Sequence, residues 1–430
     1  MILNASARRL LITTLGCLTL IFSAAFAARQ KPETQPQQVT PKVQVTVNAA
    51  LIPVVVRDAQ GRAIGNLKKQ DFQVFDGNKL QEISGFSIEE RAAAESYHSK
   101  ADPAPSPGSS VAFQQTSAAA QRFVVFLFDD MHLSEGDLAL MKKAATSMIP
   151  KALTEKDLAA VVSMSGTSSG VTRDHARLQD AIMKLTLHNP FRHVARTCPD
   201  MGYYEADRIQ NKHDIMAVDA AIENTLACCE CTRSSAEALV DEASREALQI
   251  GDQDVSVSLG LIRELVRKMG SMPGQRSLIV LSPGFLTVTV EAVAEKSRIL
   301  DLAARSNVTI SSVNARGLYT TGVEAHSQSR GSSMAERSEI QYNGQSMMLD
   351  EDVMAEFADG TGGTYFHNNN DLEAGVHLLA AAPEYLYLLE LSLQNVKQDG
   401  SYHAVKIKLA EDGLKLQARR GYFAPRPPKK

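Results

Sequence analysis

Two patterns of hydrophobic and polar positions divide this chain, and they predict two kinds of domain. In the middle of the chain, short apolar runs typical of buried strands alternate with segments of helical period. The strands are expected at 123–128, 158–164, 277–281 and 308–313, and the helices between them at 135–153, 174–185, 255–272 and 292–306. Thr172 is the expected cap of the helix over 174–185. This alternation predicts an α/β domain over residues 122–370, with a doubly wound, mostly parallel sheet flanked by helices.

Both ends of the chain alternate apolar and polar residues in the way of half-buried antiparallel strands. The pattern covers residues 42–88 and returns, after a last helix, within residues 371–430. We expect the strands of the two ends to pair and to form one small β-sandwich-like domain. Residues 89–121, rich in Ala, Ser, Pro and Gln, are expected to be a flexible linker.

Two segments interrupt the α/β pattern. Residues 186–250 are expected to form a helical insertion that carries cysteines, with a helix break between 249 and 255. Residues 316–348, rich in Ser, Gly, Gln and Met, are expected to be a mobile loop. Both segments would shape the selectivity of a binding surface.

The first 27 residues have the pattern of a cleaved signal peptide. Arg8 and Arg9 precede an apolar run from Leu10 to Phe22, and Ala25-Phe-Ala27 provides the small residues of a cleavage site. The apolar run is short for a membrane span, and no later segment has 18 consecutive apolar residues. We therefore expect an exported protein, periplasmic or secreted, without a membrane span after cleavage and with a disordered leader at 28–41. The net charge of −4 predicts no strong attraction to nucleic acid.

Four cysteines remain after that cleavage, and an even number in an exported chain predicts two disulfides. They are Cys198, Cys228, Cys229 and Cys231. Adjacent cysteines rarely bond each other, because the geometry is strained. Cys198 is therefore expected to pair with one member of the cluster. A zinc site is the alternative, but it would need C-x-x-C pairs that the sequence does not contain.

The most informative stretch is an apolar run from Arg122 to Phe128 that ends in two carboxylates. Asp129 and Asp130 follow it directly, and His132 and Ser134 come next. Ligands of open α/β sheets bind in the crevice at the carboxyl ends of the strands. These side chains could offer oxygen and imidazole ligands to a transition metal. The alternative is that Asp129 and Ser134 cap the following helix while His132 packs on the surface.

Four blocks of sequence, in their order and spacing, resemble the bacterial VWFA-related family, whose exported members contain a von Willebrand factor A-like (VWA) domain. The blocks are 54–61 with 67–77, 126–134, 273–285, and 361–366 with 418–425. The resemblance covers residues 43–425. It implies a VWA-like fold for the α/β domain, with a protein–protein interaction or adhesion role.

The same resemblance implies that the usual metal-ion-dependent adhesion site is degenerate. VWA domains hold a divalent cation with an Asp-x-Ser-x-Ser loop, a distant Thr and a second distant Asp. The first Asp corresponds to Asp129, but Met131 and Leu133 stand at the serine positions, and Ser282 begins the loop where the second Asp is expected. Mg²⁺ demands octahedral coordination by oxygen. We therefore expect no cofactor. We also expect no enzymatic activity. The expected role is to bind a protein partner of unknown identity through Asp129, Asp130, His132, Ser134 and Ser282.

Two alternatives remain open. The first is a metal-dependent adhesin with a non-standard divalent cation site at Asp129, Asp130, His132 and Ser134. The second is an exported serine hydrolase, because residues 166–170 satisfy G-x-S-x-G with Ser168 at the nucleophile position. In such hydrolases the nucleophile turn leads straight into a helix, whereas here residues 171–173 intervene.

Overall fold

The computed structural model describes residues 49–59, 62–90, 122–188, 198–318, 333–393 and 400–424. For residues 333–340 and 423 it describes the backbone alone. The expected signal peptide and leader lie outside these residues. So do residues 91–121 of the expected linker, residues 189–197 of the helical insertion and residues 319–332 of the expected loop.

A five-stranded parallel sheet forms the centre of the α/β domain, in the order β6-β5-β7-β8-β9. The strands are β5 (Arg122–Phe128), β6 (Leu158–Ser163), β7 (Gln275–Ser282), β8 (Val308–Asn314) and β9 (Tyr365–Phe366). Every residue of β5 is buried, as expected for a strand covered on both faces. The mixed α/β architecture predicted from the sequence is confirmed.

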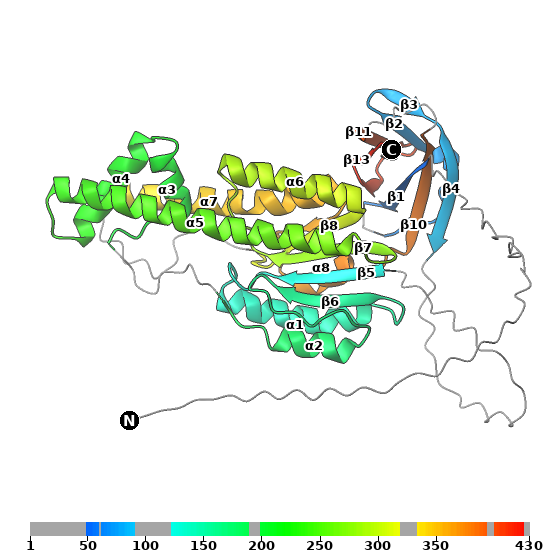
Figure 1. Cartoon of the computed structure of the whole chain (residues 1–430), viewed down its shortest axis with the longest axis horizontal. Coiled ribbons are helices and arrows are strands. Elements are labelled where there is room, and N and C mark those ends of the chain that lie inside the picture. Colours follow the sequence, from blue (N-terminus) through cyan, green and yellow to red (C-terminus); the bar gives the residue numbers. More distant parts are fainter. Residues whose placement is uncertain are drawn as a thin grey trace, which may run out of the picture. The chain divides into compact units, whose positions relative to one another are not determined.

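Helices cover both faces of this sheet (Figure 1). One face packs against α1 (Glu135–Ala152), α2 (His175–Met183) and α8 (Leu372–Ala380). The other packs against α5 (Arg233–Met269), α6 (Val290–Ser306) and α7 (Ser333–Thr361). Alternate residues of β5 divide between the two cores: Phe126 lies in the first core, whereas Leu127 lies in the second. The period of two along a strand explains this division.

The cysteine-bearing insertion is helical, as expected, and consists of α3 (Tyr203–Gln210), α4 (Ile215–Cys228) and the first part of α5. The expected helix break near 250 is wrong, because α5 is continuous over 37 residues. Gly251 in the middle of α5 allows α3 to pack closely: a Cβ atom there would lie 2.0 Å from a ring carbon of Tyr203. Cys198 pairs with Cys228, as expected for Cys198, and Cys229 pairs with Cys231.

Two further expectations differ from the structure. Residues 333–348, expected to belong to a mobile loop, form the first half of α7. Buried Tyr342 packs there against the helical insertion, so tertiary contacts outweigh the Ser- and Gly-rich composition. The cap of α2 is Asp174, whose carboxylate accepts the Ala176 amide at 2.9 Å, and Thr172 Oγ1 instead accepts the amide of Asp174.

Both ends of the chain build the second domain, which has two antiparallel four-stranded sheets in the orders β12-β1-β10-β4 and β13-β11-β2-β3. The N-terminal strands are β1 (Ala49–Arg57), β2 (Phe72–Asp76), β3 (Lys79–Gln81) and β4 (Ile83–Glu90). The C-terminal strands are β10 (Tyr385–Ser392), β11 (Tyr402–Leu409), β12 (Lys415–Ala418) and β13 (Gly421–Phe423). β1 pairs with β10 and β12, and β2 pairs with β11, which confirms the expected pairing of the two ends. Among the residues described, no helix is long and apolar enough to cross a membrane.

Candidate functional site at the carboxyl ends of the strands

The strand order places a topological switch between β5 and β7. From β5 the chain continues to β6 on one side, and the next strand, β7, pairs with β5 on the other side. Such a switch point is the place where open α/β sheets bind ligands. Asp129 follows β5 and Ser282 ends β7, and Ser282 Oγ donates a hydrogen bond of 2.5 Å to Asp129 Oδ2. This side-chain hydrogen bond, together with the bond from the Asp129 amide to the Leu281 carbonyl, joins the two sides of the switch.

The Asp129 carboxylate is completely buried, and both of its oxygens are occupied by hydrogen bonds. Oδ1 accepts the backbone amides of Met131 and His132 at 3.3 and 3.0 Å. His132 Nδ1 lies 2.8 Å from Oδ1 and 2.9 Å from Oδ2. Ser282 Oγ in turn accepts the amide of Gly284 at 2.9 Å. The carboxylate thus fixes the turn that follows β5 and ties it to the loop after β7.

His132 lies between two carboxylates. Its Nδ1 faces Asp129, and its Nε2 lies 2.9 Å from Oδ2 of Asp254 on α5. Its ring stacks on Phe285, with 5.4 Å between the ring centroids. Burial opposes the charged imidazolium, but the two carboxylates outweigh burial and raise the pKa of His132 to about 10. Both ring nitrogens then donate, which is the hydrogen-bonding pattern of imidazolium.

The pKa of Asp129 shifts in the opposite direction. Burial would raise it, but the adjacent His132 charge, with the hydrogen bonds from His132 and Ser282, lowers it below its ordinary value. The site is therefore a network of alternating charges, Asp129⁻–His132⁺–Asp254⁻. At one end of this network, the Ser282 hydroxyl donates a hydrogen bond to Asp129.

The other two residues of the expected cluster have different partners. Asp130 accepts Ser165 Oγ at 2.5 Å and the Ser165 amide at 2.9 Å, and so holds the loop after β6. Ser134 is the N-cap of α1: its Oγ accepts the Asp137 amide at 3.1 Å. Of the expected partner-binding residues, the structure joins Asp129, His132 and Ser282 directly. Over the part of the chain described, no group of three or more His, Cys, Asp or Glu side chains is placed to hold a metal ion.

Met131 and Leu133, which the family resemblance places at the two serine positions, are packing residues in this structure. Met131 and Leu133 are 3% and 4% exposed and pack in the cores on opposite faces of the sheet. Hydrophobic packing on both sides therefore anchors the loop that carries His132.

Sequence reasoning missed Asp254, Phe285 and a neighbouring ion pair. Arg316 Nη2, after β8, lies 3.2 Å from Asp350 Oδ2 on α7. Burial raises the pKa of Asp350, in spite of Arg316. Gly284 allows the β7 loop to touch α7, since its φ is +92° and a Cβ atom would lie 2.1 Å from the Asp350 carbonyl oxygen. The Ser282-Pro-Gly284 turn is a local sequence signal for the contact between the β7 loop and α7. Asp254 has no local signal as the partner of His132, because 122 residues separate the two.

Ser168, the residue of the hydrolase alternative, lies in an extended segment beside β6. Ser168 forms an antiparallel bridge with Val162, and its Oγ accepts the Gly170 amide at 3.1 Å. α2 begins only at His175. The chain around Ser168 is therefore an edge segment of the sheet rather than a sharp turn between a strand and a helix.

No protein-family model matches the chain, and no curated protein matches its sequence. Among solved structures, it is similar to proximal thread matrix protein 1 from the mussel byssus, with 13% identity and a TM-score of 0.27 over 62% of this chain and 48% of that chain. It is also similar to the pilus adhesin SpaC from Lactobacillus rhamnosus GG in its open conformation, with 7% identity and a TM-score of 0.28 over 71% of this chain and 44% of that chain. The chain thus spans about half the length of these structures. Similarity at this level carries no argument about function.

Proposed function

We propose that this chain is an exported, VWA-like interaction protein that binds a protein partner without a metal ion and without catalysis. The partner would bind to the rim of the sheet, which is formed by the loops that follow the carboxyl ends of its parallel strands. The parallel order β6-β5-β7-β8-β9, with its switch beside Asp129, supports the VWA-like assignment. The signal-peptide pattern and the two cysteine pairs support export, because disulfides persist in oxidising compartments.

The observation that carries the proposal is the position of the His132 imidazolium against Asp129. In a VWA metal site, the corresponding carboxylate would face a divalent cation. Here a side-chain cation lies against both carboxylate oxygens, at 2.8 and 2.9 Å. The charge of Asp129 is thus compensated within the chain, and the rim is held together without an added ion.

A partner would contact the loops around this buried network. Three exposed segments follow strands at the same end of the sheet: Ser134 to Gly136 after β5, Ser165 to Ser168 after β6, and His367 to Asp371 after β9. Exposed loops on a rigid scaffold are a common location of binding residues. The charge network would act as a positioning element that keeps these loops in one arrangement.

A partner-binding experiment compares two exposed hydroxyl residues, one near the carboxyl ends and one near the amino ends of the parallel strands. Thr167 is exposed on the rim, and Ser271 is exposed near the start of β7. Cross-linking of the oxidised mature protein to surface proteins of the source cells should identify a partner whose yield falls at least about ten-fold with Thr167→Arg. Ser271→Arg, with the same change of charge, should leave the yield unchanged. Equal yields from both variants would contradict binding at the rim.

Thermal unfolding separates the metal-free proposal from a metal-dependent adhesin. The oxidised chain is unfolded in EDTA and then with Mg²⁺, Ca²⁺, Mn²⁺ or Zn²⁺. A cation at 100 times its Kd would add about 2.7 kcal/mol to the free energy of unfolding. We expect no shift of Tm. A shift in the wild type that Asp129→Ala abolishes would replace the proposal with the metal-dependent one.

A further inference from the structure

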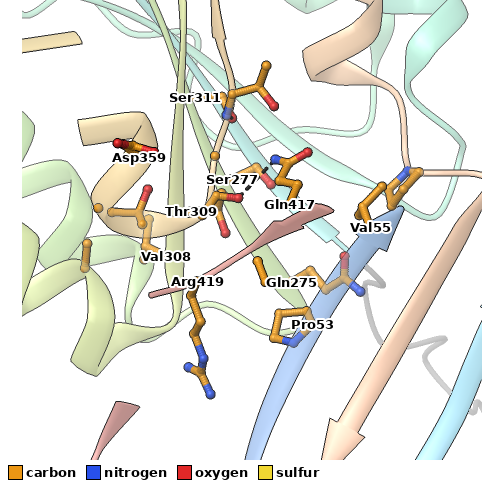
Figure 2. A pocket seen from close by; sticks show the side chains of 18 of the residues that line it. Pro53, Val55, Gln275, Ser277, Val308, Thr309, Ser311, Asp359, Gln417 and Arg419 are labelled. Atoms are coloured by element: carbon orange, nitrogen blue, oxygen red, sulfur yellow. Dashed lines mark hydrogen bonds between the residues drawn. The ribbon is translucent and has the colours of Figure 1, made fainter. Parts of the chain in front are cut away.

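A second candidate site lies at the amino ends of the parallel strands, away from Asp129 and His132. A cavity of about 790 Å³ opens where the first residues of β7 and β8 face β1 and β12. Figure 2 shows Ser277 and Thr309 on one side of this cavity and Pro53 and Val55 on the other. Its volume falls within the range of small-molecule sites, roughly 300–1,000 Å³.

The lining of this cavity is strongly cationic. It contains six basic side chains, and Asp359 is the acidic residue among those described there. The basic residues are Arg57, Arg122, Arg276, Lys415, Arg419 and Arg420. Carboxylates pair with three of them: Glu384 with Arg57, Asp157 with Arg122, and Asp359 with Arg420. For the other three, no ion pair with a carboxylate is found in the described part of the chain.

Arg419 shows most clearly that this positive charge is incompletely compensated. Its Nη1 donates to Asn307 Oδ1 at 3.1 Å and its Nη2 to the Leu51 carbonyl. Its buried Nε has no acceptor among the described residues. Burial lowers the pKa of Arg419, because it disfavours the charged form of the guanidinium. An anion in the adjacent cavity would stabilise this guanidinium by direct electrostatic attraction.

Neutral hydrogen-bonding groups line the same cavity. Ser277 and Thr309 are register partners on β7 and β8, so their hydroxyls lie side by side. Gln417 Nε2 donates to the Gly362 carbonyl at 3.0 Å and thereby links β12 to the turn before β9. Figure 2 shows Gln417 close to Thr309 and Ser277. Two hydroxyls on central strands, at positions that a closed core would fill with apolar side chains, are suited to a polar ligand.

We infer that this cavity binds a small hydroxylated organic anion. Its carboxylate or phosphate group would lie near Arg276, Lys415 and Arg419, and its hydroxyls would bond to Ser277 and Thr309. The excess of basic groups selects an anion, and the cavity volume admits a molecule larger than inorganic phosphate. The ligand would contact both domains, and its binding is independent of the proposed partner surface at the rim.

Binding is measured by isothermal titration calorimetry on the full oxidised mature chain. The probes are glucuronate and citrate for the carboxylate class, glucose 6-phosphate for the phosphate class, inorganic phosphate for the bare anion, and glucose as the neutral control. We expect saturable binding of at least one organic anion, no binding of glucose, and inorganic phosphate bound more weakly than the preferred organic anion. The order of the carboxylate and phosphate probes then identifies the anionic group.

Two variants test the assigned residues against matched controls. Arg419→Gln and Lys415→Gln should each raise the Kd of the preferred probe, by about ten-fold for Arg419→Gln. The controls Arg173→Gln and Lys143→Gln remove the same charges at exposed positions outside the cavity and should leave the Kd unchanged. Should Arg419→Gln fail to fold, exposed Lys415 carries the test alone. The inference is overturned if no organic anion binds, or if the control variants weaken binding as much as the cavity variants.

Discussion

His132 links Asp129 after β5 to Asp254 on α5, and its charge makes stability depend on pH. The pKa of His132 is raised from 6.5 to about 10 in the folded chain. A raised pKa contributes stability that is fully present below pH 6.5 and is lost as the pH rises towards 10. We therefore expect the difference in Tm between the wild type and His132→Gln to shrink steadily from pH 6.5 to pH 10, measured by thermal unfolding. A constant difference over that range would contradict a charged His132.

Ser282 provides a second test at the residue scale. Its hydroxyl is fully buried and donates to an ionised carboxylate. Ser282→Ala leaves one oxygen of Asp129 with fewer donors, so we expect a loss of about 1–3 kcal/mol in the free energy of unfolding. Urea unfolding measures this loss. Ser168→Ala, at an exposed serine, should change stability by less than about 0.5 kcal/mol.

At the scale of a single element, α5 contains two glycines that predict opposite effects of the same substitution. A Cβ at Gly251 would lie 2.0 Å from the Tyr203 ring, whereas at Gly260 it would meet no atom within 4 Å. Gly260→Ala should stabilise the protein by about 0.5–1 kcal/mol, because alanine favours the helix. Gly251→Ala should destabilise it, because α3 must move away. Urea unfolding of both variants decides this, and stabilisation by Gly251→Ala would show that α3 does not pack there.

The elements also show what the sequence can and cannot predict. The strands and most helices follow from local patterns: α1 covers 135–152, where a helix over 135–153 was predicted. The capping role proposed for Ser134 is likewise local and is confirmed. The partner of His132 is not local, because Asp254 is brought to it only when α5 packs on the sheet. The close contact of Gly251 in α5 with Tyr203 of α3 is likewise a tertiary contact that local patterns do not predict.

At the scale of the whole molecule, the insertion between β6 and β7 is tied together by a covalent link. The bond between Cys198 and Cys228 spans a sequence separation of 30 residues. A cross-link over such a loop contributes about 3–4 kcal/mol by limiting the unfolded chain. The double variant Cys198→Ser, Cys228→Ser should lose stability of this order in urea unfolding without reductant. An unchanged urea midpoint would mean that the link contributes nothing to the stability of the fold.

The boundary between the two domains lies after α8, although the sequence pattern groups this last helix with the C-terminal strands. Val376 and Ala380 of α8 are completely buried in the core that α1 and β5 share. A fragment covering 122–382 should therefore unfold in one cooperative thermal transition. A fragment covering 122–370 lacks α8 and exposes that core, so we expect it to lose the cooperative transition and to be digested rapidly by protease. Equal protease resistance of the two fragments would place α8 outside the α/β core. The comparison thus tests whether α8 is needed to complete the core of the α/β domain, although it directly precedes the C-terminal strands of the other domain.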